Sequence, residues 1–242
     1  MTGGAGRNSA DRLRWHGRRH GHALRKGRHA LIEELLPRLR VPAEVGGAPA
    51  DLAALFAESV EDIWLEVGFG AGEHLAEQAR LHPAVGMIGC EPYVNGVAAL
   101  LARVERDGLS NVRVFDDDAR LLLPCLPDAV IGRVFVLFAD PWPKKRHHKR
   151  RFPAKENLDT LARVMKDDAE LRFASDHMEF VRWSLDRFTR HPEFRWPARS
   201  PKAWRRRPED WFETRYEAKA LAQGDTCVYL AFRRRRRATA LA

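Results

Sequence analysis

The sequence is poor in cysteine and contains no long apolar run. Its 242 residues include three cysteines, Cys90, Cys125 and Cys227, which are far apart and form no CxxC pair. This spacing predicts neither a disulfide framework nor a metal site. No stretch approaches the roughly 18 consecutive apolar residues of a transmembrane helix, and residues 1–29 lack the apolar core of a signal peptide. We therefore expect a reduced, cytoplasmic protein that holds no metal and has no membrane partner.

Acidic residues are also in the minority. The chain has 33 Asp and Glu against 42 Lys and Arg, which gives a formal net charge of +9. Such a surface attracts polyanions, of which nucleic acid is the commonest, although a solvated basic surface is the plain alternative. The cations are concentrated in residues 1–40, in residues 144–151 and in the five consecutive arginines at 233–237. This clustering favours a nucleic-acid partner, with the arginine run as the weakest indication because such tails are often disordered.

The length suits one α/β domain with an additional arm. Hydrophobic residues make up 45% of the chain, enough for a packed core. Residues 1–24 are rich in Gly, Arg and His without apolar periodicity, which predicts a flexible arm. A predicted helix over 27–39 precedes a Gly/Pro/Ala linker. We therefore predict a basic N-terminal arm with a short helix over 1–50, and one domain over 51–242 that ends in a basic tail.

From residue 62 onward, short apolar runs alternate with amphipathic segments. The predicted strands lie over 62–68, 84–90, 111–115, 132–139 and 170–175; among the predicted helices, one begins near Glu73, one ends at Gly108, and two cover 154–166 and 178–188. The fourth strand is the most apolar and is therefore placed near the centre of the sheet. Strands that alternate with helices predict a parallel sheet covered on both faces.

The C-terminal segment breaks this alternation. Residues 217–232, EAKALAQGDTCVYLAF, are interpreted as two strands joined by a Gly-Asp turn. A terminal hairpin would make one edge of the sheet antiparallel. The predicted fold is an α/β, Rossmann-like class I methyltransferase architecture: a mostly parallel seven-stranded sheet, helices on both faces and a C-terminal antiparallel hairpin. Ligands bind such sheets at the carboxyl ends of the strands, where the strand order switches.

A glycine-rich turn follows the first predicted strand. In the run LEVGFGAGEHL, Gly68, Gly70 and Gly72 allow positive φ and close approach of the backbone to a ligand. A dinucleotide-binding turn needs a further glycine at position 73, where this chain has Glu73. Glu66 and the acid at the helix start suit a cation better than a pyrophosphate. This favours S-adenosylmethionine, which carries an α-amino group and a sulfonium, although an ordinary structural turn is the alternative.

Two more acids stand at the ends of the next two strands. Glu91 follows Gly72 by 19 residues, where Rossmann-type folds place a carboxylate on the ribose hydroxyls. Asp118 follows the third strand, positioned to accept the adenine amino group, with Asp116 and Asp117 as competing candidates. As alternatives, Glu91 could be a charge at a helix N-terminus and Asp118 a helix N-cap. Acids at three successive strand ends predict a pocket for S-adenosylmethionine.

The fourth strand runs into the stretch FADPWPKKRHHKRR, residues 138–151. Asp140 closes the strand, and Pro141 and Pro143 stiffen the turn that follows. Trp142 is interpreted equally as a stacking partner for a base or as packing beneath the loop. The cations that follow are positioned to hold phosphates, because phosphate contacts position a nucleic acid while base contacts specify it. The stretch is therefore predicted to join the methyl-acceptor site to its RNA anchor.

These motifs together resemble one protein family. The runs LEVGFGAGEHL, GCEPYVNGV, FADPWPKKRHHKRR, ASD and TRYE are similar to those of the bacterial tRNA (guanine-N7-)-methyltransferases, over roughly residues 60–232. A small departure is Ala139, where members of that family often have Pro or Ser. The basic N-terminal run resembles the family's basic arm only loosely. The resemblance implies methylation of a guanine in the tRNA variable loop, conventionally position 46, with S-adenosylmethionine as donor and S-adenosylhomocysteine as product.

The resemblance also implies roles for individual residues. The cofactor-side residues that it indicates are Glu66, Glu91, Asp118 and Asp140, with Asp140 as the catalytic candidate. The residues implied to contact the substrate are Lys144, Asp176, Thr214, Arg215, Tyr216 and Glu217. Those implied to bind the RNA are Arg146, His147, His148, Lys149, Arg150 and Arg151. From position alone, Asp176 is equally well explained as the N-cap of the following helix, and TRYE as an ordinary charged loop.

The chemistry of guanine N7 suits a site built on carboxylates. N7 offers an in-plane lone pair and has no proton to lose, so no strong base is required, and a nearby carboxylate would stabilise the positive charge that develops on the purine. The alternatives are a methyltransferase that acts on another RNA or on a small molecule, and a non-enzymatic RNA-binding protein. The expected partner is tRNA with no obligate protein partner, and the chain is expected to be a monomer or homodimer.

Overall fold

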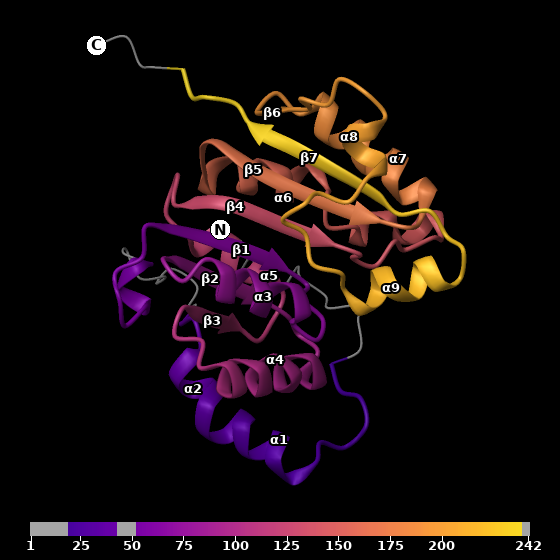
Figure 1. Cartoon of the computed structure of the whole chain (residues 1–242). Helices are drawn as coiled ribbons and strands as arrows, with labels where there is room; N and C mark the ends of the chain where they lie inside the picture. Colours follow the sequence, from indigo (N-terminus) through magenta and orange to yellow (C-terminus); the bar gives the residue numbers. More distant parts are fainter. Residues whose placement is uncertain (1–18, 43–51, 239–242) are drawn as a thin grey trace, which may run out of the picture.

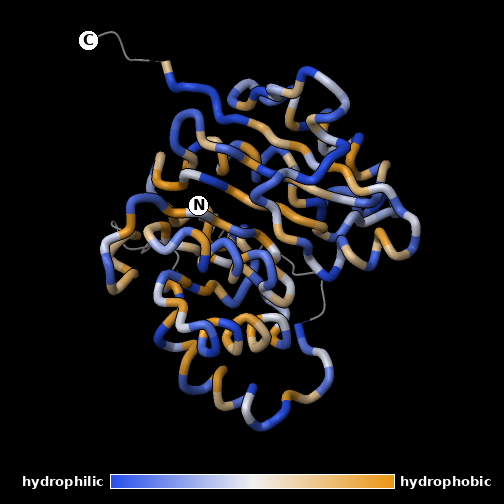
Figure 2. Tube along the Cα trace, viewed as in Figure 1, coloured by the Kyte–Doolittle hydropathy of each residue, from blue (hydrophilic) through white to orange (hydrophobic). Residues whose placement is uncertain are grey.

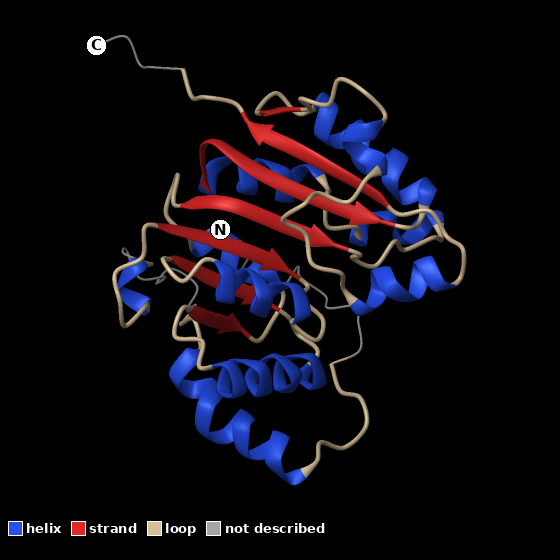
Figure 3. Ribbon diagram, in the orientation of Figure 1, coloured by secondary structure: helices blue, strands red, loops and turns tan. Residues whose placement is uncertain are grey.

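The computed structural model describes residues 19–42 and 52–238, which form a seven-stranded sheet with helices on both faces (Figures 1 and 3). The strand order is β3-β2-β1-β4-β5-β7-β6. The strands are β1 (Asp62–Val67), β2 (Val85–Cys90), β3 (Val112–Phe115), β4 (Ile131–Leu137), β5 (Met165–Ser175), β6 (Phe194–Arg195) and β7 (Val228–Arg234). β1 to β5 pair in parallel, and β7 is antiparallel to both β5 and β6. The strand order therefore switches between β1 and β4.

The helices cover the sheet in two layers. They are α1 (Lys26–Ala30), α2 (Leu36–Leu39), α3 (Glu73–Leu81), α4 (Val94–Asp107), α5 (Ala119–Leu122), α6 (Lys155–Val164), α7 (Met178–Arg190), α8 (Lys202–Arg205) and α9 (Arg215–Ala222). Apolar side chains of α2, α3, α4 and α9 join one buried cluster, and those of α5, α6 and α7 join the other. Within the described ranges, no helix is both long and apolar enough to cross a membrane.

Hydrophobic patterning explains most of these elements. β4 is buried along most of its length between the two helical layers, as its apolar sequence predicts. α4 buries residues at the helical spacing Val97, Leu100, Leu101 and Val104, and it ends at Gly108, whose φ of 64° permits the left-handed cap. Figure 2 shows hydrophobic positions along the strands and α4, and hydrophilic positions at the C-terminal end of β7. The predicted parallel core of the sheet is confirmed.

The C-terminal segment corrects one part of the prediction. The antiparallel terminal strand is present as β7, but residues 217–222, predicted as its hairpin partner, belong to α9. Thr214 caps this helix and the chain continues T-x-x-E, a capping-box sequence. Alanine, which has the highest helix propensity, occupies three of the eight helical positions. β7 instead pairs with β5 over six residues and with the short β6.

The N-terminal helix is packed into the same domain. Leu36 and Leu39 of α2 are buried in the core cluster of α3 and α4, and Arg40 forms a bridge to Val114 of β3. The five residues between α1 and α2 form a π-helical turn. Residues 1–18 of the predicted flexible arm (1–24) and residues 43–49 of the predicted linker (41–49) lie outside the described residues.

Candidate functional site

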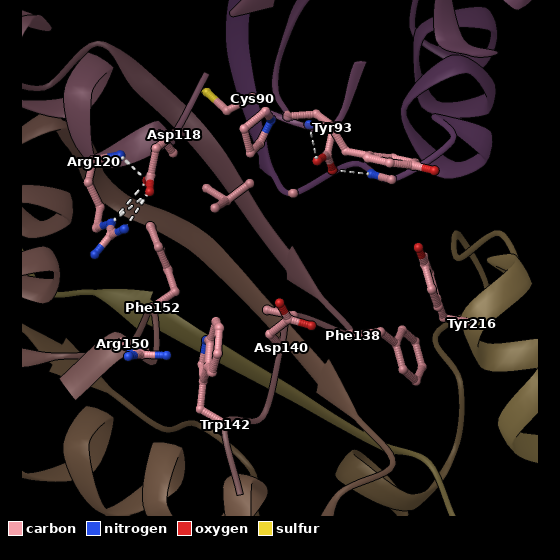
Figure 4. A pocket seen from close by; sticks show the side chains of 17 residues that line it. Cys90, Tyr93, Asp118, Arg120, Phe138, Asp140, Trp142, Arg150, Phe152 and Tyr216 are labelled. Carbon is pink, nitrogen blue, oxygen red and sulfur yellow. Dashed lines mark hydrogen bonds and ion pairs between the residues drawn. The ribbon is translucent and has the colours of Figure 1, made fainter. Parts of the chain in front are cut away.

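A cavity of about 440 Å³ opens at the carboxyl ends of β1 to β4, next to the switch in strand order. Its walls come from the turns after these strands and from the first turn of α9 (Figure 4). The residues that line it are Val67, Gly68, Gly70, Cys90, Glu91, Pro92, Tyr93, Asp118, Ala119, Arg120, Phe138, Ala139, Asp140, Trp142, Arg150, Phe152 and Tyr216. Its position is the one expected for a ligand site in such a sheet, and its size is typical of a small-molecule pocket.

The glycine-rich turn after β1 forms one wall. Gly68, Gly70 and Gly72 have φ of 72°, 58° and 74°, a conformation that other residues rarely adopt. Gly68 and Gly70 line the cavity, and a side chain on Gly70 would come within 3.0 Å of Tyr216. A side chain on Gly72 would instead collide with Leu100 of α4 at 2.6 Å. Gly72 therefore serves the close packing of α3 on α4 rather than the cavity.

Glu91 ties this turn to the end of β2. Its carboxylate accepts hydrogen bonds from the backbone N–H groups of Gly70 at 2.8 Å and Tyr93 at 3.0 Å. Burial raises the pKa of Glu91 to about 7, in spite of those two hydrogen bonds, and the charges of Asp140 and Glu66 act in the same direction as burial. Glu91 therefore faces the cavity as a carboxylate that ionises near neutral pH.

Three consecutive aspartates follow β3 and have different partners. Asp116 and Asp117 form ion pairs of 2.8 and 2.7 Å with arginines of the N-terminal segment. Asp118 accepts the backbone N–H of Arg120 at 3.0 Å as the N-cap of α5, and also pairs with the Arg120 guanidinium (Figure 4). Asp118 lines the cavity as well. Asp118 is thus both the helix cap and a cavity residue, so the two interpretations of this residue are compatible. Of the three aspartates, it is the one that faces the cavity.

Glu66 is held in the interior and does not line the cavity. Its carboxylate lies 2.8 Å from Nδ1 of His74 on α3, and both side chains are buried. The His74 ring in turn packs against Phe135 and Trp211. The pair joins the end of β1 to α3, so Glu66 supports the glycine turn from behind.

Asp140 stands on a strained turn after β4. Phe138 and Trp142, on either side, have φ of 51° and 43°, which residues other than glycine rarely adopt. The carboxyl group of Asp140 points into the cavity (Figure 4), and among the described residues it has no hydrogen-bond or ion-pair partner. Partial burial raises its pKa. Strained turns and unpaired carboxyl groups in cavities are concentrated at functional sites.

The cations that follow Asp140 form a 3-10 helix over Lys145–Arg150. The exposed cations, none of which pairs with an acid of the described chain, are Lys144, Lys145, Arg146 and Lys149. His147 and His148 are half-buried. The guanidinium carbon of Arg150 lies 4.9 Å from the ring centre of Trp142, and both residues line the cavity. Trp142 therefore packs within the loop and also borders the cavity.

Arg151 differs from the rest of this basic block. Its side chain has no exposed surface, donates to the carbonyl of Pro141 at 2.7 Å and pairs with Glu179 of α7. The predicted contact of Arg151 with RNA conflicts with this burial. A guanidinium can satisfy a carbonyl and a carboxylate at once, and here it fastens the Asp140 turn to α7.

The first two residues of the TRYE run shape the first turn of α9, and the third reaches the cavity. Thr214 is the N-cap, and its hydroxyl accepts the backbone N–H of Glu217 at 3.2 Å. Arg215 pairs with Glu73 at 2.6 Å, which joins α9 to the start of α3. Tyr216 is 52% exposed and lines the cavity next to Gly70 (Figure 4).

Glu217 points the opposite way from Tyr216, into the interior. Its carboxylate is fully buried and accepts hydrogen bonds from the Tyr229 hydroxyl at 2.5 Å and the Trp211 indole at 2.8 Å. The predicted contact of Glu217 with substrate conflicts with this burial. The network fixes α9 on the sheet and thereby fixes the place of Tyr216.

Asp176 follows β5 and is exposed. The alternative interpretation of this residue as a helix cap is wrong, because the N-cap of α7 is His177, whose ring accepts the backbone N–H of Phe180 at 3.3 Å. Asp176 is not part of the cavity lining. It lies at the same end of the sheet as the cavity, since β5 is parallel to β4.

Four of the five arginines at 233–237 pair with acids of the protein. Arg233 and Arg234 belong to β7. The ion pairs of the run are Arg233–Glu170 at 2.8 Å, Arg234–Asp167 at 2.9 Å, Arg236–Asp168 at 2.5 Å and Arg237–Asp167 at 2.5 Å. Arg237 also donates to three backbone carbonyls of residues 162–165. These four arginines hold the edge of the sheet together, whereas the exposed Arg235 donates to the carbonyl of Phe194 at 3.2 Å and has no acidic partner among the described residues.

Several residues at the cavity carried no signal that sequence reasoning used. Arg120 and Phe152 line it although they lie outside every run on which the prediction was based, and Tyr93, which lies in the run GCEPYVNGV, was given no role. Residues 19–22 bind the start of α4, directly after the lining residue Tyr93: the N–H of Val94 donates to the carbonyl of Arg19 at 3.0 Å, and Asn95 hydrogen-bonds to the backbone of 21–22. Contacts between segments more than 70 residues apart follow from tertiary packing alone.

Sequence comparisons identify close relatives of this chain. Residues 60–230 match the model of a family described as a putative methyltransferase. A tRNA (guanine-N(7)-)-methyltransferase of Rhodospirillum rubrum is 50% identical over 227 residues, which cover 93% of this chain and 89% of that protein. The protein of the same name from Chelativorans sp. is 50% identical over 216 residues, covering 89% and 93%.

Solved structures share the fold at low sequence identity. The 16S rRNA methyltransferase KamB superposes with a TM-score of 0.52 at 18% identity, covering 73% of this chain and 89% of that one. The [4+2]-cyclase SpnF superposes with a TM-score of 0.50 at 16% identity, covering 74% and 77%. Because one of these neighbours is a cyclase, the shared fold does not by itself assign methyl transfer.

Proposed function

The chain belongs to the tRNA (guanine-N(7)-)-methyltransferase family, and on that premise we propose that it transfers a methyl group from S-adenosylmethionine to N7 of a guanine in tRNA, with S-adenosylhomocysteine as the other product. The guanine at position 46 of the variable loop is the target that the family resemblance implies. The observation that carries the proposal is that Glu91, Asp118 and Asp140 open onto one cavity, and that the exposed cations among residues 144–149 follow directly from its wall. Acids on separate faces would have contradicted it.

The residues of the cavity fit S-adenosylmethionine better than a phosphate-bearing cofactor. Carboxylates accept hydrogen bonds from hydroxyl and amino groups, and they repel a pyrophosphate. We assign the ribose hydroxyls to Glu91 and the adenine amino group to Asp118. The turn at Gly68 and Gly70 would receive the amino-acid end of the cofactor, because its backbone lies open to the cavity. S-adenosylmethionine supplies the methyl group on its sulfonium sulfur.

Asp140 is assigned to the acceptor side of the reaction. Transfer to N7 forms the N7–methyl bond as the sulfur–methyl bond breaks, and the purine gains the positive charge that the sulfonium loses. No proton leaves N7, so no general base is needed. The unpaired Asp140 carboxylate stabilises this charge as it develops, and the strained turn fixes its position in advance.

The polynucleotide is assigned to the rim of the cavity. Tyr216 and Trp142 line the cavity with aromatic rings, which suits stacking on an extruded base. Lys144, Lys145 and the adjacent cations provide phosphate contacts beside that base. Asp176 and Thr214 stay as substrate-side proposals, with Thr214 acting through the cap of α9.

The direct test is formation of 7-methylguanosine. Purified protein is incubated with labelled S-adenosylmethionine and unmodified bulk tRNA, and the tRNA is then digested to nucleosides. We expect label in 7-methylguanosine, and its absence would contradict the proposal. Transcripts with and without the variable-loop guanine separate this activity from methylation of another RNA or of a small molecule.

A non-enzymatic RNA-binding role makes a different prediction. It requires tRNA binding without cofactor affinity, so calorimetric titration with S-adenosylmethionine distinguishes the two. Glu91, Asp118 and Asp140 in one cavity favour the enzyme.

A further inference from the structure

A second group of exposed cations lies outside the residues already assigned to RNA. Residues 196–206, here called the edge segment, contain Arg199, Lys202, Arg205 and Arg206 and no acid. All four side chains are exposed. Among the described residues none of them forms an ion pair or a hydrogen bond through its side chain, whereas Arg207, directly after the segment, pairs with Glu213 at 3.1 Å.

The edge segment is a built structure rather than a loose loop. The rings of Trp196 and Trp204 pack with 5.1 Å between their centres, and both indoles are half-buried against the core cluster. Backbone hydrogen bonds to the carbonyls of Ser200 and Pro201 close the turn of α8, which packs against β7 next to the short edge strand β6 (Figure 1). The four cations are therefore presented from a fixed scaffold, which lowers the entropy cost of their binding to a ligand.

Ion pairs and hydrogen bonds also link the chain after the edge segment to α9, whose first turn lines the cavity. From Arg206 the chain crosses the sheet towards α9 (Figure 1). On this crossing Asp210 pairs with Arg172 at 2.8 Å, and its carbonyl accepts Gln78 of α3 at 2.8 Å. Trp211 then bonds to the buried Glu217 of α9. A ligand bound on the edge segment is thus held in a fixed position relative to Tyr216.

We propose that the edge segment is a second binding surface for the phosphate backbone of tRNA, separate from the cations of residues 144–149. The inference rests on the proposed function, because the cavity can hold one nucleoside while the substrate is a large polyanion that extends well beyond it. Three of the four cations are arginines, whose planar fork matches a phosphate. Cations without an acidic partner exchange mobile counterions for phosphates on binding, which arginines already paired within the protein do not.

The test compares two variants from which the same charge is removed. The first replaces Arg199, Lys202, Arg205 and Arg206 by Ala. The matched control replaces by Ala four exposed cations that already form an ion pair with an acid one to four positions away: Arg80, Arg106, Lys155 and Arg190. Binding of full-length unmodified tRNA is measured over a range of salt concentrations, together with steady-state methylation, cofactor affinity and thermal unfolding.

For tRNA binding by the edge variant, we expect the slope of log K against log salt concentration to decrease in magnitude. The decrease should be about 0.7–0.9 for each phosphate that the variant no longer neutralises, so about 2–4 in total. KM for tRNA should rise at least about tenfold, while kcat at saturating tRNA and the affinity for S-adenosylmethionine stay unchanged. The control should keep the slope of the natural protein. Replacing the three arginines by Lys should restore most of the slope, which a purely structural role would not predict.

The following results overturn the inference. If the edge variant has the same slope and the same KM for tRNA as the control, the edge segment does not contact the RNA. A change in oligomeric state on gel filtration, with the slope kept, assigns the surface to protein contact instead. If the edge variant shows the predicted decrease in slope but the natural protein forms no 7-methylguanosine, the proposed RNA-binding surface is supported and the proposed reaction is refuted. If the natural protein forms 7-methylguanosine and the edge and control variants have equal slopes, only the proposed RNA-binding surface is refuted.

Discussion

Two basic segments of this chain look alike in sequence and differ in structure. Residues 144–151 contain six Lys and Arg, and residues 233–237 contain five consecutive arginines. In the first segment the exposed Lys and Arg side chains have no acidic partner among the described residues, and the neighbouring Asp140 is also unpaired there. In the second, four arginines pair with acids of residues 167–170. Local charge density thus does not tell whether the charge is available to a ligand.

The acids around each segment make the difference. The chain around 233–237 folds against a turn that contains Asp167 and Asp168, so four of its five arginines are paired with acids within the protein. The chain around 144–151 follows the carboxyl end of the central strand β4, where the described residues offer its exposed cations no acid. We therefore propose the phosphate contacts for residues 144–149, whose exposed cations the fold leaves without acidic partners among the described residues.

The largest effect is expected at the unpaired carboxylate. Asp140→Asn should lower turnover about a hundredfold or more while tRNA and cofactor affinities persist, because it removes a fixed charge from the developing cation. Single-turnover methylation with saturating tRNA measures this. The matched change Asp168→Asn, on a carboxylate that pairs with Arg236, should leave turnover intact. Normal turnover in Asp140→Asn would refute its assigned role.

The next effect is on RNA affinity. Replacing Lys145, Arg146 and Lys149 by Ala should weaken tRNA binding and reduce the salt slope by about 2–3. The triple change Arg233→Ala, Arg236→Ala and Arg237→Ala removes the same charge from paired positions and should keep the slope. Equal slopes in the two triple variants would erase the distinction between the segments.

Cofactor affinity should depend on pH through Glu91. Since burial raises its pKa to about 7, affinity for S-adenosylmethionine should fall below pH 7, by at most about tenfold per pH unit. The effect on stability has the opposite sign: an acid with a raised folded-state pKa stabilises the fold as pH falls from about 7 towards its ordinary value. Glu91→Gln should flatten both profiles relative to the natural protein. An unchanged pH profile of affinity in that variant would exclude Glu91 as the titrating group.

The smallest functional effect is expected at Arg151, which lies in the first segment but is paired like the second. Arg151→Ala should lower the free energy of unfolding by about 1–3 kcal/mol, because buried carbonyl groups lose their donor, and leave the salt slope of tRNA binding unchanged. Arg151→Lys should not restore stability, since an ammonium lacks the guanidinium fork. Chemical denaturation measures the free energy of unfolding. A reduced salt slope of tRNA binding in Arg151→Ala would indicate that Arg151 contacts the RNA.

Much of the fold was predictable because its signals are local. The apolar run of β4, the periodic apolar residues of α4 and the positive φ required at Gly108 each follow from a few neighbouring residues. The acids Glu91, Asp118 and Asp140 were predictable as a group, because the carboxyl ends of parallel strands meet at one edge. The helix at α9 was missed because residues 217–232 were interpreted as two strands joined by the Gly-Asp turn, although Thr214 and Glu217 have the spacing of a capping box.

The sequence alone determined the alternation of strands and helices, the family and the acids at the strand ends, because backbone conformation and hydrophobic period depend on near neighbours. Tertiary structure decided which charged side chains stay available. Glu66, Arg151 and Glu217 are turned into the interior by His74, Glu179 and Tyr229, partners between 8 and 28 positions away. A charged side chain is satisfied by whatever the fold brings within about 3 Å, and that distance is fixed only when the chain has packed.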